Sequence, residues 1–572
     1  MRLRRWLSGL TGSRKGRDRA DAALYCRRGA ELHAAGSLEP ARESLQKAVE
    51  LDPDSADARN NLGCVLLAQG KPDAAIGHLV RALEVKPDFL EAAHNLALAW
   101  LAAGDLAQAE YFSRLALEID PASAEMHLHL GNVLRQAGRH EEALASCSEA
   151  VRLQPDLAQA RNNLGTALRE LGRAQEASEA FAKAVALDPR LAEAHLNLGI
   201  ALHQANEPDR AAAHYRAALE LDPRGVDACV NLGMLLEEKG DPVGAIRHYR
   251  QAISIEPESA AAHFNLALQL LLTGDFAAGW EEYEWRLRMP GLAPLWPHAG
   301  RPRWDGSALD GKTVLLYAEQ GFGDAIQFVR FAPLVAERGA RVILSCAASL
   351  MALFEDVPGI AALADWSEPA PAFDLCCSLL SLPRIFRTMV ATLPAKIPYL
   401  HANPDAMRRW NARLGADAAR LKVGLVWATQ SSNKTAASRS LRLGMFSPLA
   451  VTSEILFCSL QLGPGADDIA HAPAGMRIVD FGRELEDFSA TAALIANLDL
   501  VISIDTAVAH LAGAMGKPVW TLTQFPPEWR WLLDRDDSPW YPTMRLFRQE
   551  RINEWAPVIG RLAAALEERV RK

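Results

Sequence analysis

Residues around position 505 have the types and spacing of an anion-binding site. Asp505 and Thr506 follow the apolar run DLVISI (499–504), and His510 stands four residues after Thr506. Where a strand ends and a helix begins, backbone N–H groups and the helix dipole favour a bound anion such as a phosphate. The four-residue spacing places Thr506 and His510 on one face of that helix. A lone histidine is usually structural, but Asp-Thr-x-x-x-His at such a junction favours a binding site.

Two earlier loops contain groups that would complement this site. In YAEQGFGDAIQF (317–328), Gly321 and Gly323 permit a tight turn into a helix that begins near Asp324. Taken alone, Asp324 is interpreted as a helix cap. The loop VWATQSSNKTAASRSLRL (426–443) is rich in hydroxyl groups and contains Lys434 and Arg439, cations that suit a diphosphate. A solvated surface loop is the alternative interpretation of this second segment.

The elements that must position these loops alternate short apolar runs with helical segments. Such alternation predicts parallel sheets, in which ligands bind at the carboxyl ends of the strands. The runs form two groups, which predict Rossmann-like halves at 312–405 and 406–572, and the last helix (556–570) is expected to pack on the first half. The predicted strands are TVLLY (313–317), RVILSC (341–346), FDLCC (373–377), LKVGLVW (421–427), EILFCSL (454–460), DLVISI (499–504) and PVWTLT (518–523).

The first half of the chain repeats with a period of 34 residues, the tetratricopeptide value. Each proline ends a helix, and small residues at two further register positions allow two helices to pack closely. Eight units fit residues 22–290 and resemble tetratricopeptide repeats, which predicts an α-solenoid. The recurring prolines are Pro53, Pro87, Pro121, Pro155, Pro189, Pro223 and Pro257.

One register of the repeat is polar. If the recurring glycine is position 8, position 6 is asparagine in six units, with Arg28 and His129 in the other two. A carboxamide both donates and accepts hydrogen bonds, so a row of them on the inner wall could bind the backbone of an extended peptide. The alternative is that these amides bond the repeat scaffold. The predicted peptide groove consists of Asn61, Asn95, Asn163, Asn197, Asn231 and Asn265.

The ends of the repeat region differ from its middle. The last unit has Arg286 where other units have alanine, and it contains Trp280 and Trp285, which predicts a cap docked on the next domain. A linker at 291–311 follows. Residues 1–21 form a basic segment, interpreted as a disordered tail, with weak membrane-surface contact by residues 1–19 as the alternative.

The composition excludes several classes of protein. The net charge of −9 gives no reason to expect a nucleic-acid partner, and no apolar run reaches the length of a membrane span. The eight cysteines show no metal-binding spacing. Buried, reduced thiols and a cytoplasmic location are therefore expected.

Together the loops resemble the GT-B glycosyltransferases of the heptosyltransferase-like family, glycosyltransferase family 9. The segments that carry the resemblance are GFGD (321–324), GLVWA…RS (424–440) and DTAVAHLAGAMGKPV (505–519), and it covers about residues 300–572. With the repeats, the architecture is similar to bacterial O-GlcNAc-transferase-like and flagellin-type protein glycosyltransferases. The resemblance implies a tetratricopeptide superhelix followed by an α/β GT-B fold, whose first half is the acceptor side and second half the nucleotide-sugar side.

The resemblance also implies roles for individual residues. Asp324 would be the catalytic base, and the second loop departs from related chains because Thr429, Gln430 and Ala436 replace glycine, asparagine and aspartate. Ala507 replaces the glycine of a DTG motif. The implied donor-binding residues are Gly321, Gly323, Lys434, Arg439, Ser440, Asp505, Thr506 and His510.

The implied function is glycosyl transfer of the hexosyl or heptosyl type, inverting and without a metal. A nucleotide-diphosphate sugar would be the co-substrate, with no further cofactor, and a protein Ser/Thr hydroxyl presented by the repeats would be the acceptor. The Asp534–Asp536 pair resembles a metal-binding DxD but is interpreted as surface. Two alternatives stay open: a non-catalytic binding scaffold whose transferase half has decayed, and transfer to a glycan or lipid intermediate.

Overall fold

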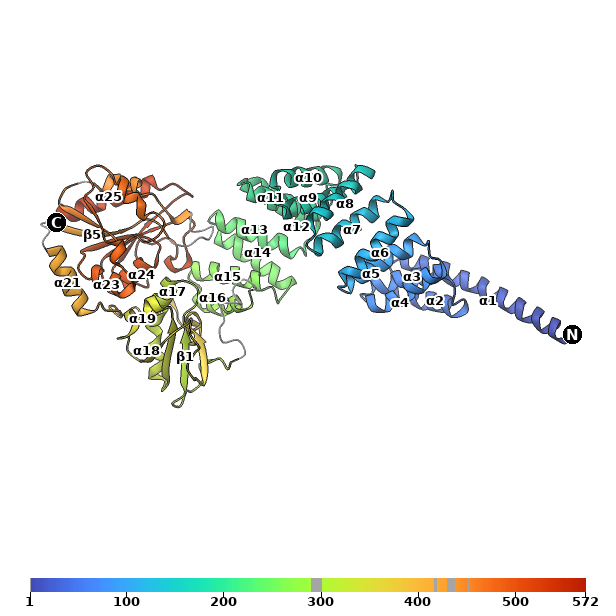
Figure 1. Cartoon of the computed structure of the whole chain (residues 1–572), viewed down its shortest axis with the longest axis horizontal. Coiled ribbons are helices and arrows are strands. Elements are labelled where there is room, and N and C mark those ends of the chain that lie inside the picture. The colour runs from blue at the N-terminus through green and yellow to red at the C-terminus, as the bar shows by residue number, and fades with distance from the viewer. Residues whose placement is uncertain (1, 290–300, 416–418, 430–437, 451, 572) are drawn as a thin grey trace. The chain divides into compact units, whose positions relative to one another are not determined.

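The computed structural model describes residues 2–289, 301–415, 419–429, 438–450 and 452–571. The chain folds into two compact units, Met1–Ala228 and Cys229–Lys572 (Figure 1). The first unit is entirely helical within the described residues. The second contains further repeat helices and two parallel sheets.

Twelve described helices of the first unit follow one another in pairs, as Figure 1 shows from blue to green. Each pair is one tetratricopeptide unit, and the helices are 13 or 14 residues long apart from the first. Their bounds are α1 (Arg2–Ala34), α2 (Leu38–Leu51), α3 (Ala56–Ala68), α4 (Pro72–Val85), α5 (Leu90–Ala102), α6 (Leu106–Ile119), α7 (Ala124–Gln136), α8 (His140–Leu153), α9 (Ala158–Glu170), α10 (Ala174–Leu187), α11 (Ala192–Gln204) and α12 (Pro208–Leu221).

Small residues bring the two helices of a pair into close contact. Ala75 and Ala82 of α4 are fully buried. The glycine register is even more constrained, because a Cβ on Gly165 would stand 2.6 Å from Cε1 of Phe181. The ring of Phe181 is itself fully buried. The recurring glycines therefore mark the positions where two helices pack too closely to leave room for a side chain.

Helix α1 differs from the predicted disordered tail. It runs without interruption from Arg2 to Ala34, so residues 2–21 continue the first repeat helix. The physical reason is composition: residues 2–34 contain no proline and are rich in arginine, leucine and alanine, which are strong helix formers.

The last repeat helices lie in the second unit and dock on the α/β domain. Trp280 donates from Nε1 to the carbonyl oxygen of Thr388 at 3.0 Å, and its ring centroid lies 5.3 Å from that of Trp529. Arg286 is 0% exposed and its Nη2 lies 2.6 Å from Oε1 of Glu319. The predicted docking of this unit is confirmed. The helices are α13 (Val226–Glu238), α14 (Pro242–Ile255), α15 (Ala260–Leu272), α16 (Phe276–Tyr283) and the 3-10 helix η1 (Glu284–Arg288).

The predicted linker is described only in its second part. Residues 291–300 lie outside the described residues. Trp304 is buried, and its backbone N–H donates to the carbonyl oxygen of Cys376 at 2.9 Å. Residues 301–311 therefore lie along the first sheet.

The first sheet has four parallel strands in the order β3-β2-β1-β4. Its core strands are apolar throughout, as expected for a parallel sheet covered on both faces. Helices α17 (Phe322–Phe328), α18 (Ala332–Glu337), α19 (Ala348–Phe354) and α20 (Leu382–Ile385) accompany it. The strands are β1 (Thr313–Tyr317), β2 (Arg341–Cys346), β3 (Ile360–Asp365) and β4 (Leu375–Ser378).

The second sheet has six parallel strands in the order β10-β9-β8-β5-β6-β7. Two Rossmann-like sheets are therefore present, as predicted for a GT-B fold. Helices α21 (Pro404–Gly415), α23 (Phe488–Ile495), α24 (Ala507–Ala514) and α25 (Ala556–Arg571) accompany it. The strands are β5 (Leu421–Val426), β6 (Ile455–Ser459), β7 (Ile478–Asp480), β8 (Leu500–Ile504), β9 (Val519–Thr523) and β10 (Met544–Arg548).

Helix α25 packs on the second half, and the expectation that it packs on the first is wrong. Leu562 and Leu566 are buried in one core with Phe446 and Phe547, which belong to the second half. The sequence also gave no sign of β3, β7 and β10. Strand β3 is alanine-rich and only half-buried, β7 has three residues, and arginines interrupt β10.

Candidate active site

The three loops singled out in the sequence leave strands at the points where the strand order reverses. Tyr317, at the end of β1, pairs with Ser378 of β4, and the first loop follows β1. Val426, at the end of β5, pairs with Ser503 of β8, and the second and third loops follow these two strands. Ligands bind at such switch points in open parallel sheets. The topology therefore gives each loop a position suited to binding.

The first and third loops touch each other. Helix α17 packs against α24. A Cβ on Gly323 would stand 2.9 Å from Cδ2 of His510. Gly323 is therefore required by this close approach between the two halves, in addition to the turn it permits.

Asp324 accepts hydrogen bonds on both of its carboxylate oxygens. Oδ2 accepts the backbone N–H of Gly321 at 2.9 Å, so Asp324 does cap the start of α17. Oδ1 forms an ion pair with Nη2 of Arg530. Each carboxylate oxygen has two lone pairs, so capacity to accept a further proton donor is retained.

Arg530 connects Asp324 to a second carboxylate, that of Glu528. Arg530 Nη1 pairs with Glu528, and Nε donates to Oε1 of Gln327 at 2.7 Å. The Glu528 side chain is 28% exposed. Burial, with further contributions from Asp505 and Asp324, raises the pKa of Glu528 to about 7, against the opposing effect of Arg530. Glu528 and Asp324 thus bind the same guanidinium group, that of Arg530. A carboxyl group that titrates near neutrality is a typical feature of catalytic sites.

Asp505 is buried and fixed by the residues around it. Trp531 Nε1 donates to its Oδ2 at 3.0 Å. His510 Nε2 lies 3.9 Å from its Oδ1, and Arg439 Nη1 lies 3.9 Å from its Oδ2. Arg439 belongs to the second loop, so this carboxylate joins the second and third loops.

His510 is held as a neutral ring. It is 5% exposed, lies against Trp531 with a centroid distance of 5.3 Å, and its Nδ1 is 2.9 Å from the hydroxyl of Tyr541. Burial, together with the positive charges of Arg530, Arg330 and Arg439, lowers the pKa of His510 well below its ordinary value. His510 therefore contributes packing and hydrogen bonding, and no positive charge at pH 7.

The start of α24 is open to a ligand. Thr506 is the N-cap residue, but its side chain makes no hydrogen bond to the first turn of the helix. Its Oγ1 instead lies 3.0 Å from Oγ of Ser503. The first N–H groups of a helix have no partner inside the helix. The Thr506 carbonyl oxygen accepts the N–H of Ala509 at 3.0 Å, but the Thr506 side chain caps none of these groups.

The second loop is described in part. Lys434 lies outside the described residues. Ser440 Oγ accepts the backbone N–H of Thr429 at 3.2 Å. Arg439 Nε is buried and has no hydrogen-bond partner within the described part of the chain. This N–H is a donor that an anion at the start of α24 could satisfy.

Comparisons with known proteins agree with this division of the chain. Tetratricopeptide models match residues 29–70, 60–124, 123–190, 162–226 and 226–259. The model of "Glycosyltransferase family 9 (heptosyltransferase)" matches residues 471–528, which contain the third loop. The chain therefore carries tetratricopeptide repeats, and its second half contains a segment similar to glycosyltransferase family 9.

Protein FlbA of Caulobacter vibrioides is 30% identical over 325 residues, which are 52% of this chain and 53% of FlbA. The match thus spans about half the length of this curated relative. Among solved structures, PilF of Pseudomonas aeruginosa is 24% identical with a TM-score of 0.33, covering 36% of this chain and 94% of PilF. A thermophilic tetratricopeptide protein of Thermus thermophilus is 25% identical with a TM-score of 0.29, covering 32% and 99%.

The asparagine register of the repeats bonds largely to the repeats themselves. Asn95 Nδ2 donates to Oδ1 of Asn60 at 2.9 Å, and Asn197 Nδ2 donates to Oδ1 of Asn162 at 2.9 Å. Asn61 approaches Cys26 Sγ at 3.5 Å, and Gln159 donates to Asn163. Asn231 also has a partner, and no side-chain hydrogen bond is recorded for Asn265 within the described residues. A polar cavity of about 290 Å³ lies beside Asn163 and Asn197.

Several residues of the site were missed by the sequence analysis. Arg530, Glu528 and Trp531 stand together in PPEWRW (526–531), and Tyr541 follows ten residues after Trp531. The signal that could have found them is Arg530, which stands between Trp529 and Trp531, since a charge beside large apolar residues needs a partner. That partner is Asp324, more than two hundred residues earlier.

The DxD pair is exposed, with Asp534 and Asp536 both at the surface. All eight cysteines are free thiols, and six of them are buried. No described helix is both long and apolar enough to cross a bilayer.

Proposed function

We propose that the chain transfers a sugar from a nucleotide-diphosphate donor to a hydroxyl of a protein acceptor, with inversion and without a metal ion. One observation carries the proposal: the three loops that follow the reversal points of the two sheets meet. Arg439 of the second loop lies 3.9 Å from Asp505 of the third, and Gly323, beside Asp324 in the first, lies against His510 of the third. The family 9 match on residues 471–528 supports a glycosyltransferase in general.

In this proposal the donor diphosphate occupies the start of α24. The helix dipole and the N–H groups at the start of α24 favour the anion, and the Thr506 side chain does not cap them, although the N–H of Ala509 donates to the Thr506 carbonyl oxygen. The Nε–H of Arg439, which has no partner among the described residues, adds a charged donor. These groups are fixed before the reaction, so they stabilise the charge that develops on the leaving diphosphate without rearrangement.

Asp324 is the proposed base. Its carboxylate takes the proton of the acceptor hydroxyl while the oxygen attacks the anomeric carbon and the bond to the diphosphate breaks on the opposite side. Arg530 holds the Asp324 carboxylate in place through its ion pair. Glu528, whose pKa is near 7, shares Arg530 and therefore adjusts how strongly Arg530 binds Asp324.

The last repeat unit supports delivery of an acceptor to this site. Arg286 of η1 is bonded to Glu319, which lies in the loop that leads from β1 to Asp324. Trp280 contacts Trp529, which is adjacent to Arg530. These final helices therefore contact the segments that carry Asp324 and Arg530, so an acceptor bound to them would lie on elements packed against the proposed base.

A second candidate function is a binding scaffold without catalysis. The ion pair between Asp324 and Arg530 favours it, because Arg530 occupies one of the carboxylate oxygens that a base would use. The two candidates differ in whether sugar is transferred, and in whether a sugar nucleotide binds at all.

The test uses the full chain, a panel of nucleotide-diphosphate sugars and calorimetry, followed by a transfer assay with whichever donor binds. Asp324→Asn should retain donor binding and lose about 10²–10⁴-fold in kcat. Arg439→Gln should weaken donor binding. Asp534→Asn, in an exposed carboxylate, is the matched control and should leave both unchanged. Absence of binding to every donor contradicts the enzyme, and full activity of Asp324→Asn excludes Asp324 as the base.

A further inference from the structure

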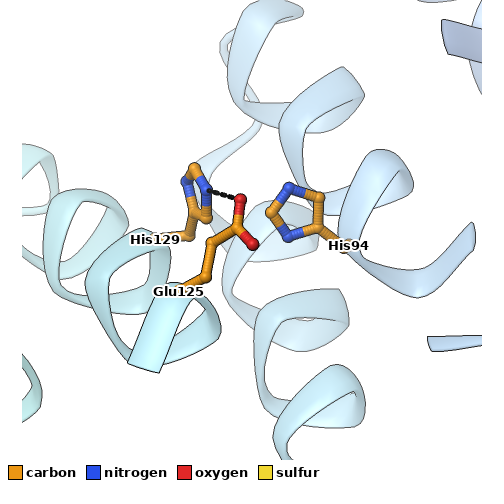
Figure 2. A group of neighbouring side chains, drawn as sticks. All are labelled: His94, Glu125 and His129. Atoms are coloured by element: carbon orange, nitrogen blue, oxygen red, sulfur yellow. Dashed lines mark ion pairs between the residues drawn. The ribbon is translucent and has the colours of Figure 1, made fainter. Parts of the chain in front are cut away.

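A cluster of three side chains in the repeats has the donor atoms of a metal site. Within the described residues, His94, Glu125 and His129 are the group whose nitrogen and carboxylate ligand atoms all lie within 4.8 Å of one another. Figure 2 shows the Glu125 carboxylate between the two imidazole rings. His94 belongs to α5, whereas Glu125 and His129 belong to α7, so the cluster joins neighbouring repeats.

The repeat register shows that this cluster is a local departure. Position 6 is asparagine in six units but histidine at His129. His94 precedes Asn95, the position-6 residue of the preceding unit. Glu125 lies four residues before His129, and this i, i+4 spacing places both side chains on one face of α7. His129 therefore places an imidazole where six units carry a carboxamide, and it faces His94 of the preceding unit.

The distances suit an ion more than direct bonding. His129 Nε2 and Glu125 Oε1 are 3.9 Å apart, which is longer than a hydrogen bond. Ligand atoms about 2.0–2.2 Å from a tetrahedral metal lie roughly 3.4 Å from one another. The two imidazole centroids are 4.4 Å apart with the rings edge to face. Only small rotations are needed to close these atoms around one ion, and Glu125 is 70% exposed and free to make them.

The surroundings of His94 supply the orientation that metal-bound histidines usually have. Its Nδ1 lies 2.9 Å from Sδ of the buried Met126, so a proton on Nδ1 donates to the thioether and leaves Nε2 as the ligand atom. A second partner that fixes the ring in this way is typical of metal-ligating histidine.

We propose that His94, Glu125 and His129 bind one divalent first-row transition ion, with Zn²⁺ as the best match. Two imidazoles and one carboxylate are the ligand types that such ions prefer, and three protein ligands leave the fourth position to water. The ion would join α5 to α7 and fix the angle between two adjacent repeats. This site is independent of the proposed glycosyl transfer, and its test does not depend on that activity.

The test measures Zn²⁺ binding to the full chain by competition with a chromophoric chelator, with Co²⁺ as a spectroscopic probe. The wild type should bind one equivalent that gives visible Co²⁺ bands typical of nitrogen and oxygen ligands. His129→Asn should lose that equivalent, by more than about 100-fold in affinity, because loss of even an outer-shell partner costs about 10–100-fold.

His129→Asn is expected to fold, since it restores the residue that six other units carry at this position. Glu125→Gln, at an exposed position, should also lose the equivalent. His127→Gln removes another histidine of α7 outside the cluster and should bind like the wild type. Equal Zn²⁺ and Co²⁺ binding by wild type and His129→Asn, or loss of the same equivalent in His127→Gln, would overturn the proposal.

Discussion

The repeats and the strand-rich region place their charged side chains in opposite ways. In the first unit, pairs such as Arg173–Glu176 lie at i, i+3 on helix surfaces and both partners are exposed. In the second unit, Arg286 and Arg530 are buried against carboxylates from distant parts of the chain. A surface pair contributes little to stability, whereas a buried charge must be compensated by its partners.

This difference indicates which kind of residue carries function in each region. A solenoid built from local contacts can change surface residues from one unit to the next, which is how His129 replaces asparagine without loss of the repeat. The strand-rich region holds its functional groups by long-range bonds. Its chemistry is therefore coupled to its stability. Mutations of charged residues should change the unfolding free energy much more in the strand-rich region than in the repeats.

The largest expected effect is on the buried pair that docks the last repeat. Arg286→Met leaves Glu319 buried without its cation, which should cost about 3–5 kcal/mol of unfolding free energy. Twelve of the fourteen tryptophans lie at or after residue 280, so tryptophan fluorescence during urea unfolding reports on the second unit.

The control for this change is Arg173→Met in the repeats. Loss of this exposed pair should cost no more than about 1 kcal/mol of unfolding free energy, measured by circular dichroism. The double change Arg286→Met with Glu319→Met should recover much of the stability, because both charges are removed together. Equal losses for Arg286→Met and Arg173→Met would contradict the contrast between the regions.

Glu528 should make the stability of the second unit depend on pH. Its pKa is raised from 4.5 to about 7, so the protonated form favours the folded state. That contribution is complete below about pH 4.5 and is lost as the pH rises through about 7. Since one pKa unit corresponds to about 1.4 kcal/mol, the change is about 3 kcal/mol at most.

The measurement is the difference in unfolding free energy between wild type and Glu528→Gln from pH 5 to pH 8. This difference should fall with rising pH, because the glutamine cannot titrate. Glu567→Gln, at an exposed position on α25, should show a flat difference. A flat difference for Glu528→Gln would mean that Arg530 keeps Glu528 ionised throughout.

Two glycines of the repeats, one in the glycine register and one outside it, should respond in opposite directions to substitution by alanine. Gly165→Ala places a methyl group 2.6 Å from the buried ring of Phe181 and should cost about 1–3 kcal/mol. Gly77, inside α4, has nothing within 4 Å of an added Cβ, and Gly77→Ala should stabilise by up to about 1 kcal/mol. Urea unfolding followed by circular dichroism compares them. A stabilising Gly165→Ala would show that Phe181 can move.

How much the sequence could predict also differs between the regions. The period of 34 residues predicted the helix pairs, because every contact between helices recurs with the sequence. In the second unit, apolar runs predicted seven strands and the three loops that follow the reversal points. Periodicity contains no information about strand order, so the packing of α25 was assigned to the wrong half.

The site shows the same limit. Asp324 and Asp505 could be singled out because each stands at a recognisable strand-to-helix junction. Arg530, which pairs with Asp324, lies in a 3-10 turn (η9, Trp529–Trp531) with no such pattern. A single sequence shows which residues stand at a junction but not which distant side chain is folded against them.

The smallest effect tests the asparagine register itself. Asn197→Ala removes a buried amide that donates to Asn162 and accepts from Arg169 at 3.1 Å, so it should cost about 1–2 kcal/mol of stability. Asn265→Ala should change stability by less than about 0.5 kcal/mol, because its side chain makes no recorded hydrogen bond within the described residues. Urea unfolding of each variant checks both values. If Asn265→Ala instead weakens acceptor capture in a transfer assay while Asn197→Ala does not, the register divides into scaffold and groove. Equal stability losses would assign both to the scaffold, and the acceptor would then be held by other residues.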